Sequence, residues 1–177
     1  MDLLTHYIAR GAQPWNVSTE AAWLDYELRA WIGPRLVRRK PRRVCNIGIG
    51  TGLWDDWLGH LIDRRAVLTS VDPDPEACQL FALRQLHERH PHPAQIVCGD
   101  VADGCLAGSA FDAITIVGSA LAEAPDRLAI ETALLDALAP GGVLLIGAVL
   151  LAGAPIPAGA EQRWLGDIVV ALRELIR

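Results

Sequence analysis

A short apolar strand followed by three alternating glycines is the feature that most limits how this chain can fold. The run from Val44 to Ile47 reads as a buried strand, and Gly48, Gly50 and Gly52 follow at every second position. Glycine tolerates backbone conformations that other residues avoid, so such a turn lets the backbone approach a ligand closely at a helix N-terminus. The sequence therefore predicts a strand, a ligand-binding turn and a helix, in that order.

The spacing of these glycines argues against a dinucleotide ligand. The phosphate-binding pattern G-x-G-x-x-G needs a third small residue at position 53, which here is Leu53. The chain has G-x-G-x-G instead, so a different ligand is expected.

Acidic residues stand after the next two predicted strands. Residues 66–71 read as a second strand that ends in Asp72, and residues 95–98 read as a third, followed by Asp100. A carboxylate after the second strand can accept hydrogen bonds from both ribose hydroxyls of a nucleoside. A carboxylate after the third can accept from the amino group of adenine.

Two further strands complete the predicted core. Residues 111–117 read as a fourth strand that ends at Gly118 and Ser119, and a helix follows. The turn Pro140-Gly141-Gly142 then leads into a fifth strand, from Val143 to Ile146 or a little beyond. Strands that alternate with helices predict an α/β fold with a parallel sheet.

From about residue 40 to about residue 150 the chain resembles the class I S-adenosylmethionine-dependent methyltransferases. The resemblance implies a three-layer, Rossmann-like, mostly parallel sheet and S-adenosyl-L-methionine as cofactor. It places the glycines at the methionine end of the cofactor, Asp72 at the ribose, Asp100 at the adenine and Gly118 beside the sulfonium. The residues expected to bind the cofactor are Asn46, Gly48, Gly50, Gly52, Asp72, Pro73, Asp100, Val101, Gly118 and Ser119.

The chain departs from this family at Asn46, where an acid is usual and helps to hold the ammonium group of the cofactor. An amide carbonyl is an acceptor without charge. The contact to the ammonium is therefore expected to be weaker, or to come from another residue.

The second departure is the length after strand five, where the family adds a hairpin of two strands. Residues 151–159 read as a loop, and residues 161–177 read as one helix. The apolar stripe of this helix consists of Trp164, Leu165, Ile168, Leu172, Leu175 and Ile176. We therefore expect no closing hairpin, and a sheet of five strands in the order 3-2-1-4-5.

One domain is expected, with residues 1–40 as an N-terminal helical cap, 41–150 as the cofactor-binding core and 151–177 as a loop and C-terminal helix. In this family such N-terminal helices often wall the acceptor pocket, so Tyr7, Arg10, Trp15 and Glu20 are candidates for lining it. Candidates for the catalytic group are Tyr7, Glu20 and, from the segment after strand four, Glu123. Helix packing is the preferred interpretation for Trp23, Tyr26 and Trp31.

Composition restricts the partners. The formal charge of −5 argues against a general nucleic-acid binder. The basic run in residues 35–43 is interpreted as a solvated linker, with a patch for an anionic partner as the alternative.

Other patterns exclude further classes of protein. The segment from Gly118 to Glu123 lacks the D/N-P-P-Y pattern of amide and base N-methyltransferases. No membrane span and no signal peptide are predicted. Four cysteines without C-x-x-C spacing suggest buried, reduced thiols and a cytoplasmic location.

His87, His90 and His92 are interpreted as part of an exposed turn before strand three, away from the ligand edge, so no metal site is expected.

A small-molecule methyltransferase is the first hypothesis for function. The second is other chemistry on the same cofactor, either aminocarboxypropyl transfer or cyclisation. The third is a non-catalytic, nucleoside-binding interaction module. An exposed apolar edge at strand five also predicts a possible homodimer.

Overall fold

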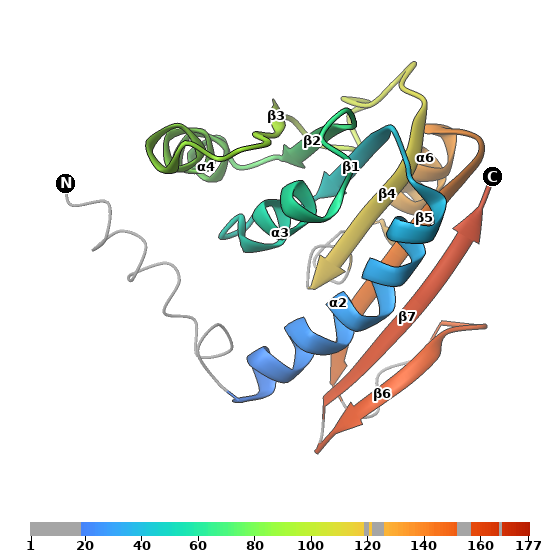
Figure 1. The fold of residues 1–177 in the computed structure, drawn as a ribbon. Helices are drawn as coiled ribbons and strands as arrows, with labels where there is room; N and C mark the ends of the chain where they lie inside the picture. Colours follow the sequence, from blue (N-terminus) through green and yellow to red (C-terminus); the bar gives the residue numbers. More distant parts are fainter. Residues whose placement is uncertain (1–18, 119–120, 122–125, 152–156, 167) are drawn as a thin grey trace.

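The computed structural model describes residues 19–118, 121, 126–151, 157–166 and 168–177. They form one seven-stranded sheet with helices on both faces (Figure 1). The elements in chain order are α2 (Thr19–Arg39), β1 (Arg43–Ile47), α3 (Leu53–Leu61), β2 (Val67–Asp72), α4 (Pro75–Glu88), β3 (Gln95–Cys98), β4 (Phe111–Gly118), α6 (Arg127–Asp136), β5 (Leu138–Leu151), β6 (Glu161–Leu165) and β7 (Ile168–Ile176).

The strand order is β3-β2-β1-β4-β5-β7-β6, and the first five strands are parallel. The predicted order 3-2-1-4-5 is thus confirmed for these five. Strand β1 lies between β2 and β4, and the side chains of Val44, Cys45 and Asn46 are fully buried. Helices on both faces explain why these strands are almost continuously apolar.

The predictions of a five-stranded sheet and of a C-terminal helix over residues 161–177 are wrong. This segment forms β6 and β7, and β7 is antiparallel to both β5 and β6. Strand β5 is also longer than predicted, and β7 pairs with it from Val143 to Leu151. Strand five is therefore not an edge, and the argument for a homodimer that rested on an exposed edge no longer holds.

The apolar spacing of the C-terminal segment fits a helix, but its composition favours strands. Strand β7 begins Ile168-Val169-Val170, and β-branched side chains pack well on a pleated surface. Val169 to Leu172 are all at most 1 % exposed, which a helix with one apolar face does not produce. Gly166, with φ of 55°, stands between the two strands, and Gly-Asp between apolar runs is a hairpin signal.

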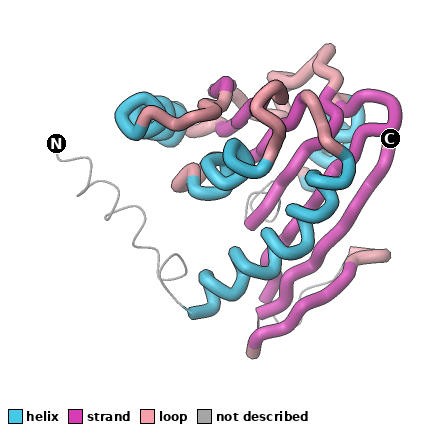
Figure 2. The backbone as a smooth tube through the Cα atoms, viewed as in Figure 1, coloured by secondary structure: helices cyan, strands magenta, loops and turns pink. Residues whose placement is uncertain are grey.

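Helices α2 and α3 cover one face of the sheet, and α6 covers the other (Figures 1 and 2). Trp31 is buried in the core beneath α2 and Trp23 packs against that core, as predicted, whereas Tyr26 is 67 % exposed, so the packing prediction is wrong for it. Helix α4 packs beside β2 and β3.

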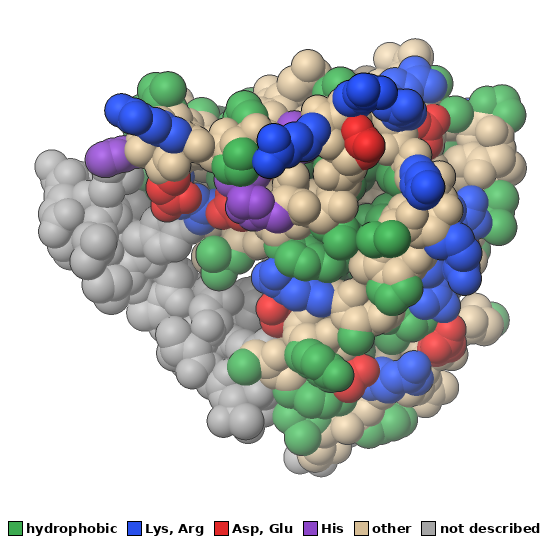
Figure 3. All heavy atoms as spheres, viewed as in Figure 1, with side chains coloured by type: hydrophobic (Ala, Val, Ile, Leu, Met, Phe, Trp, Pro, Cys, Tyr) green, Lys and Arg blue, Asp and Glu red, His purple; other side chains and the backbone are tan. Residues whose placement is uncertain are grey.

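The basic segment is not a linker over its whole length, because α2 continues through Pro34 to Arg39. Lys40, with φ of 49°, ends the helix just before Pro41. Arg35 and Arg39 form ion pairs of 3.1 and 2.9 Å with Glu174 of β7. In the view of Figure 3, basic side chains (blue) lie along the right side of the molecule, with acidic side chains (red) between them. Part of the positive charge is thus neutralised within the fold.

The thiols and histidines only partly follow their predictions. Cys45 and Cys78 are buried, but Cys98 is exposed. His90 is half-buried, because Gly59 of α3 lets it approach closely, and its ring lies tilted against that of His60 with centroids 4.7 Å apart. His92, also half-buried, lies 2.7 Å from the Ala66 carbonyl, so an exposed turn is the wrong description for both residues.

Among the described residues, no group of three metal-binding side chains is placed to hold an ion. No helix in the described part of the chain is long and apolar enough to cross a membrane.

Candidate functional site

The glycine turn lies where β1 ends and α3 begins. Gly48, Gly50 and Gly52 have φ of 85°, 51° and 73°, which is the left-handed region that favours glycine. The Gly48 amide donates to the Val71 carbonyl at 2.8 Å, and the Gly52 amide donates to the Ile49 carbonyl at 2.7 Å. The turn is thereby fastened to the neighbouring strand β2 and closed upon itself.

The second and third glycines are needed for different reasons. A Cβ on Gly52 would lie 2.4 Å from Cδ2 of Phe81 in α4, so this position is small because the fold packs against it. A Cβ on Gly50 would meet nothing within 4 Å. Gly50 therefore faces open space, as expected of a position that a ligand approaches.

Asp72, the last residue of β2, is 8 % exposed and holds the glycine turn. Its Oδ2 accepts from the amides of Ile49 at 2.7 Å and Gly50 at 3.3 Å, and its Oδ1 accepts from the Asp74 amide at 2.9 Å. The carboxylate predicted to bind the ribose thus also fixes the loop above it.

The other predicted positions follow the ends of neighbouring strands. Because β1 to β4 are parallel, their C-terminal ends meet at one edge of the sheet. Asp100 lies beyond β3 and is exposed, and its Oδ1 accepts from the Ala102 amide at 2.8 Å. Val101 is buried, and Pro73 is exposed beside Asp72. Gly118 ends β4 with φ of 80° and open space at its missing Cβ.

A row of polar side chains crosses the sheet beneath the glycine turn. Asn46 of β1 is in register with Ser70 of β2 and Thr115 of β4, and all three are fully buried. Asn46 Oδ1 accepts from the Thr115 hydroxyl at 2.8 Å. Its Nδ2 donates to Oδ1 of Asp55 in α3 at 3.0 Å and to the Gly48 carbonyl at 3.1 Å. Asn46 is therefore bound within the protein at both ends of its amide.

Comparison with known proteins agrees with this geometry. The model of a family described as "Methyltransferase domain" matches residues 44–142, which is more than half of the chain. This chain belongs to that methyltransferase family. The predicted family is thereby confirmed, and with it S-adenosylmethionine as the methyl donor of this domain.

One curated protein is similar to this chain in sequence. A protein-L-isoaspartate O-methyltransferase of Shewanella loihica (strain ATCC BAA-1088 / PV-4) is 30 % identical over 111 residues, which are 63 % of this chain and 47 % of that protein. The chain thus spans about half the length of this curated relative.

Two solved structures share the fold. A putative sarcosine dimethylglycine methyltransferase from Galdieria sulphuraria superposes with a TM-score of 0.65 at 13 % identity, covering 91 % of this chain and 63 % of the other. The O-methyltransferase TomG from Streptomyces achromogenes, solved with SAM, gives 0.57 at 17 % identity, covering 83 % and 65 %.

Several predicted residues of the methyltransferase domain lie outside the described residues. These are Tyr7, Arg10, Trp15, Ser119 and Glu123. Glu20 is in the first turn of α2, but its side chain is also outside the described part. The acceptor side of the site therefore stays a prediction.

Sequence reasoning missed Asp55 of α3, whose carboxyl group is hydrogen-bonded to Asn46 and Ser70 of the polar row. It lies in the first turn of α3, is fully buried, and accepts through Oδ1 from Asn46 and from the Ser70 hydroxyl. Desolvation raises its pKa from 3.8 to about 7, against the lowering effect of these two hydrogen bonds and with a further rise from Asp56. Polar residues at matching positions of apolar strands, such as Ser70 and Thr115, were the signal for this cluster.

The stability of the methyltransferase domain should depend on pH through Asp55. The folded carboxyl titrates near 7 and an unfolded one near 4, so between these values the folded chain holds a proton that the unfolded chain has lost. The contribution of Asp55 to the free energy of unfolding therefore falls as pH rises from about 4 to about 7. Asp55→Asn removes this dependence, so the variant should gain stability relative to the wild type between pH 5 and pH 8, as urea unfolding would measure. Parallel pH profiles for the two proteins would contradict the expectation.

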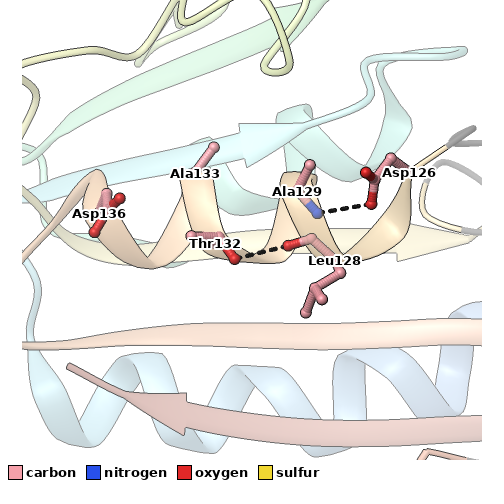
Figure 4. Close-up of a pocket in the computed structure, with 6 residues that line it drawn as sticks. All are labelled: Asp126, Leu128, Ala129, Thr132, Ala133 and Asp136. Atoms are coloured by element: carbon pink, nitrogen blue, oxygen red, sulfur yellow. Dashed lines mark hydrogen bonds between the residues drawn. The ribbon is translucent and has the colours of Figure 1, made fainter.

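An open depression on the outer side of α6 contains none of the predicted site residues (Figure 4). It is lined by Asp126, Leu128, Ala129, Thr132, Ala133 and Asp136. Asp126 accepts from the Ala129 amide at 3.0 Å, and the Thr132 hydroxyl donates to the Leu128 carbonyl at 2.8 Å. Two of the three polar side chains that line this depression, Asp126 and Thr132, thus bond to the backbone of α6 itself.

Proposed function

We propose that this chain transfers the methyl group of S-adenosylmethionine to a small-molecule acceptor. The observation that carries the proposal is the open backbone turn at Gly50, which is held by Asp72 at the edge where four parallel strands end. A ligand that carries both an amino-acid arm and a nucleoside fits such a turn with a carboxylate beside it.

The chain's own residues suit the cofactor. Open space at Gly50 and Gly118 admits close contact with a bound molecule. Asp72 lies beside the turn and is the proposed partner of the ribose, and the exposed carboxylate of Asp100 is the proposed acceptor for the adenine amino group. Val101 adds a buried apolar side chain at that end.

When bound, S-adenosylmethionine supplies a methyl group already activated by the sulfonium, which an acceptor atom takes by in-line displacement while the carbon–sulfur bond breaks. The protein then has mainly to align the two molecules and to exclude water. A general base is needed where the acceptor is a hydroxyl or a protonated amine. Tyr7, Glu20 and Glu123 remain the candidates for the catalytic group.

Charge supports a small acceptor over nucleic acid. The chain has a net charge of −5, whereas phosphate backbones bind surfaces rich in unpaired Lys and Arg. Arg35 is engaged by both Glu174 and Glu161, at 3.1 and 3.2 Å. Two of the three arginines in the last turns of α2, Arg35 and Arg39, are thus already paired with acids of the hairpin.

Calorimetric titration of the full chain with S-adenosylmethionine tests the cofactor step. Turnover with pooled metabolites then tests the chemistry, because methyl transfer releases S-adenosylhomocysteine and transfer of the aminocarboxypropyl arm releases 5′-methylthioadenosine. We expect micromolar binding and S-adenosylhomocysteine as the product. Methylthioadenosine as the product would favour the second chemistry, and a folded chain that binds no cofactor would favour the interaction module.

A further inference from the structure

Asp55 has an unused oxygen directly beneath the proposed cofactor turn. Its Oδ1 holds two donors, but none of the described residues donates a hydrogen bond to its Oδ2, which is inaccessible to solvent. A buried carboxylate oxygen without a partner is costly, so the site is incomplete unless a donor or a cation reaches it.

The position of this carboxylate suits a ligand of the glycine turn. Asp55 is three residues beyond Gly52 and binds Asn46, whose amide in turn binds the Gly48 carbonyl. It also lies in the first turn of α3, where the helix dipole favours a negative charge. One side chain therefore separates the carboxylate from the backbone of the turn.

Asn46 is poorly suited to bind a cation itself. Its carbonyl oxygen already accepts a hydrogen bond from Thr115, and its Nδ2 donates two hydrogen bonds to protein oxygens. The net effect of Asn46 is to hold Asp55 on one side and Thr115 on the other. The negative charge of the polar row therefore resides on α3 and not on β1.

We propose that Asp55 is the anionic partner of the cofactor's ammonium group. The inference rests on the proposed binding of S-adenosylmethionine and deepens it. An ammonium group supplies three charged N–H donors, and Oδ2 of Asp55 has no donor among the described residues. The raised pKa of this buried acid in the free protein agrees with a missing cation.

Three ligands separate this role from a purely structural one. S-adenosylmethionine and S-adenosylhomocysteine both carry the ammonium, whereas 5′-methylthioadenosine has no amino-acid arm. We expect Asp55→Asn to weaken the first two by a similar factor of roughly 10 to 100, measured by calorimetry at pH 8, because hydrogen bonds to charged groups are worth that much. Binding of 5′-methylthioadenosine should not change.

Two further variants guard the test against misfolding and general charge effects. Asp56→Asn removes the adjacent acid, which pairs with Arg84, and should leave all three affinities unchanged. Asn46→Asp combined with Asp55→Asn keeps one acid and one amide in the same row and should recover most of the binding.

Equal loss of all three ligands in Asp55→Asn, or loss of none, would overturn the inference. So would a loss confined to S-adenosylmethionine, because that ligand differs from S-adenosylhomocysteine in the sulfonium. A folded wild type that binds none of the three would instead overturn the proposed function, and the inference with it.

Discussion

Gly50→Ala is expected to weaken the binding of S-adenosylmethionine strongly while the fold survives. The added methyl group would meet no protein atom within 4 Å, so its steric effect falls on the ligand alone. The strain of an L-residue at φ of 51° costs about 1–2 kcal/mol of folding stability. A methyl group in the path of the cofactor should lower the affinity by about 100-fold or more, equivalent to roughly 3 kcal/mol.

Gly159→Ala is the matched control for this variant. Gly159 has φ of 74° and equally open surroundings, but it stands before β6 and away from the turn. Both variants should lose similar stability in chemical denaturation, and only Gly50→Ala should lose the cofactor in calorimetry. If Gly50→Ala binds as well as Gly159→Ala, the cofactor does not lie against this turn.

Asp72→Ala is expected to weaken both the fold and the cofactor site. The buried Asp72 carboxylate accepts three backbone hydrogen bonds, two of them from the glycine turn. The Ile49 amide is buried and the other two donors are part-buried, so stranding them should cost about 3 kcal/mol or more of unfolding free energy, at about 1–3 kcal/mol for each donor left buried. The cofactor should lose the acceptor of its ribose and an ordered turn together, so we expect affinity to fall at least as far as in Gly50→Ala.

Asp74→Ala serves as the control, since Asp74 is an acid two residues away that caps α4 by accepting from the Glu76 amide at 2.9 Å. Loss of such a cap costs about 1 kcal/mol. Its cofactor affinity, measured where both variants are fully folded by circular dichroism, should match the wild type. Tight binding by folded Asp72→Ala would remove Asp72 from the proposed site.

The part of the fold around the glycine turn was predictable because its signals are local. Buried apolar runs such as Val44–Ile47 end in turn residues or acids, and right-handed crossovers leave little choice of strand order. The hairpin of β6 and β7 was missed because Leu165, Ile168 and Leu172 also fit a helical period. What decides the matter is pairing with β5, which lies more than ten residues earlier in the chain.

The candidate site shows the same division. Gly50 and Asp72 were found because each follows directly from a strand end. Asp55 was missed because its meaning depends on Asn46 and Ser70, which come from two strands and meet this helix residue only in the folded protein. The different roles of Gly50 and Gly52 depend likewise on Phe81.

The ion pair between Arg35 and Glu174 joins residues 139 positions apart in the sequence. During synthesis, α2 leaves the ribosome long before the strand against which it packs has been translated. Such distant contacts repay the entropy of closing a very long loop only late, so they slow folding. The part of α2 that packs on β7 must therefore wait exposed or be shielded by other molecules until β7 arrives.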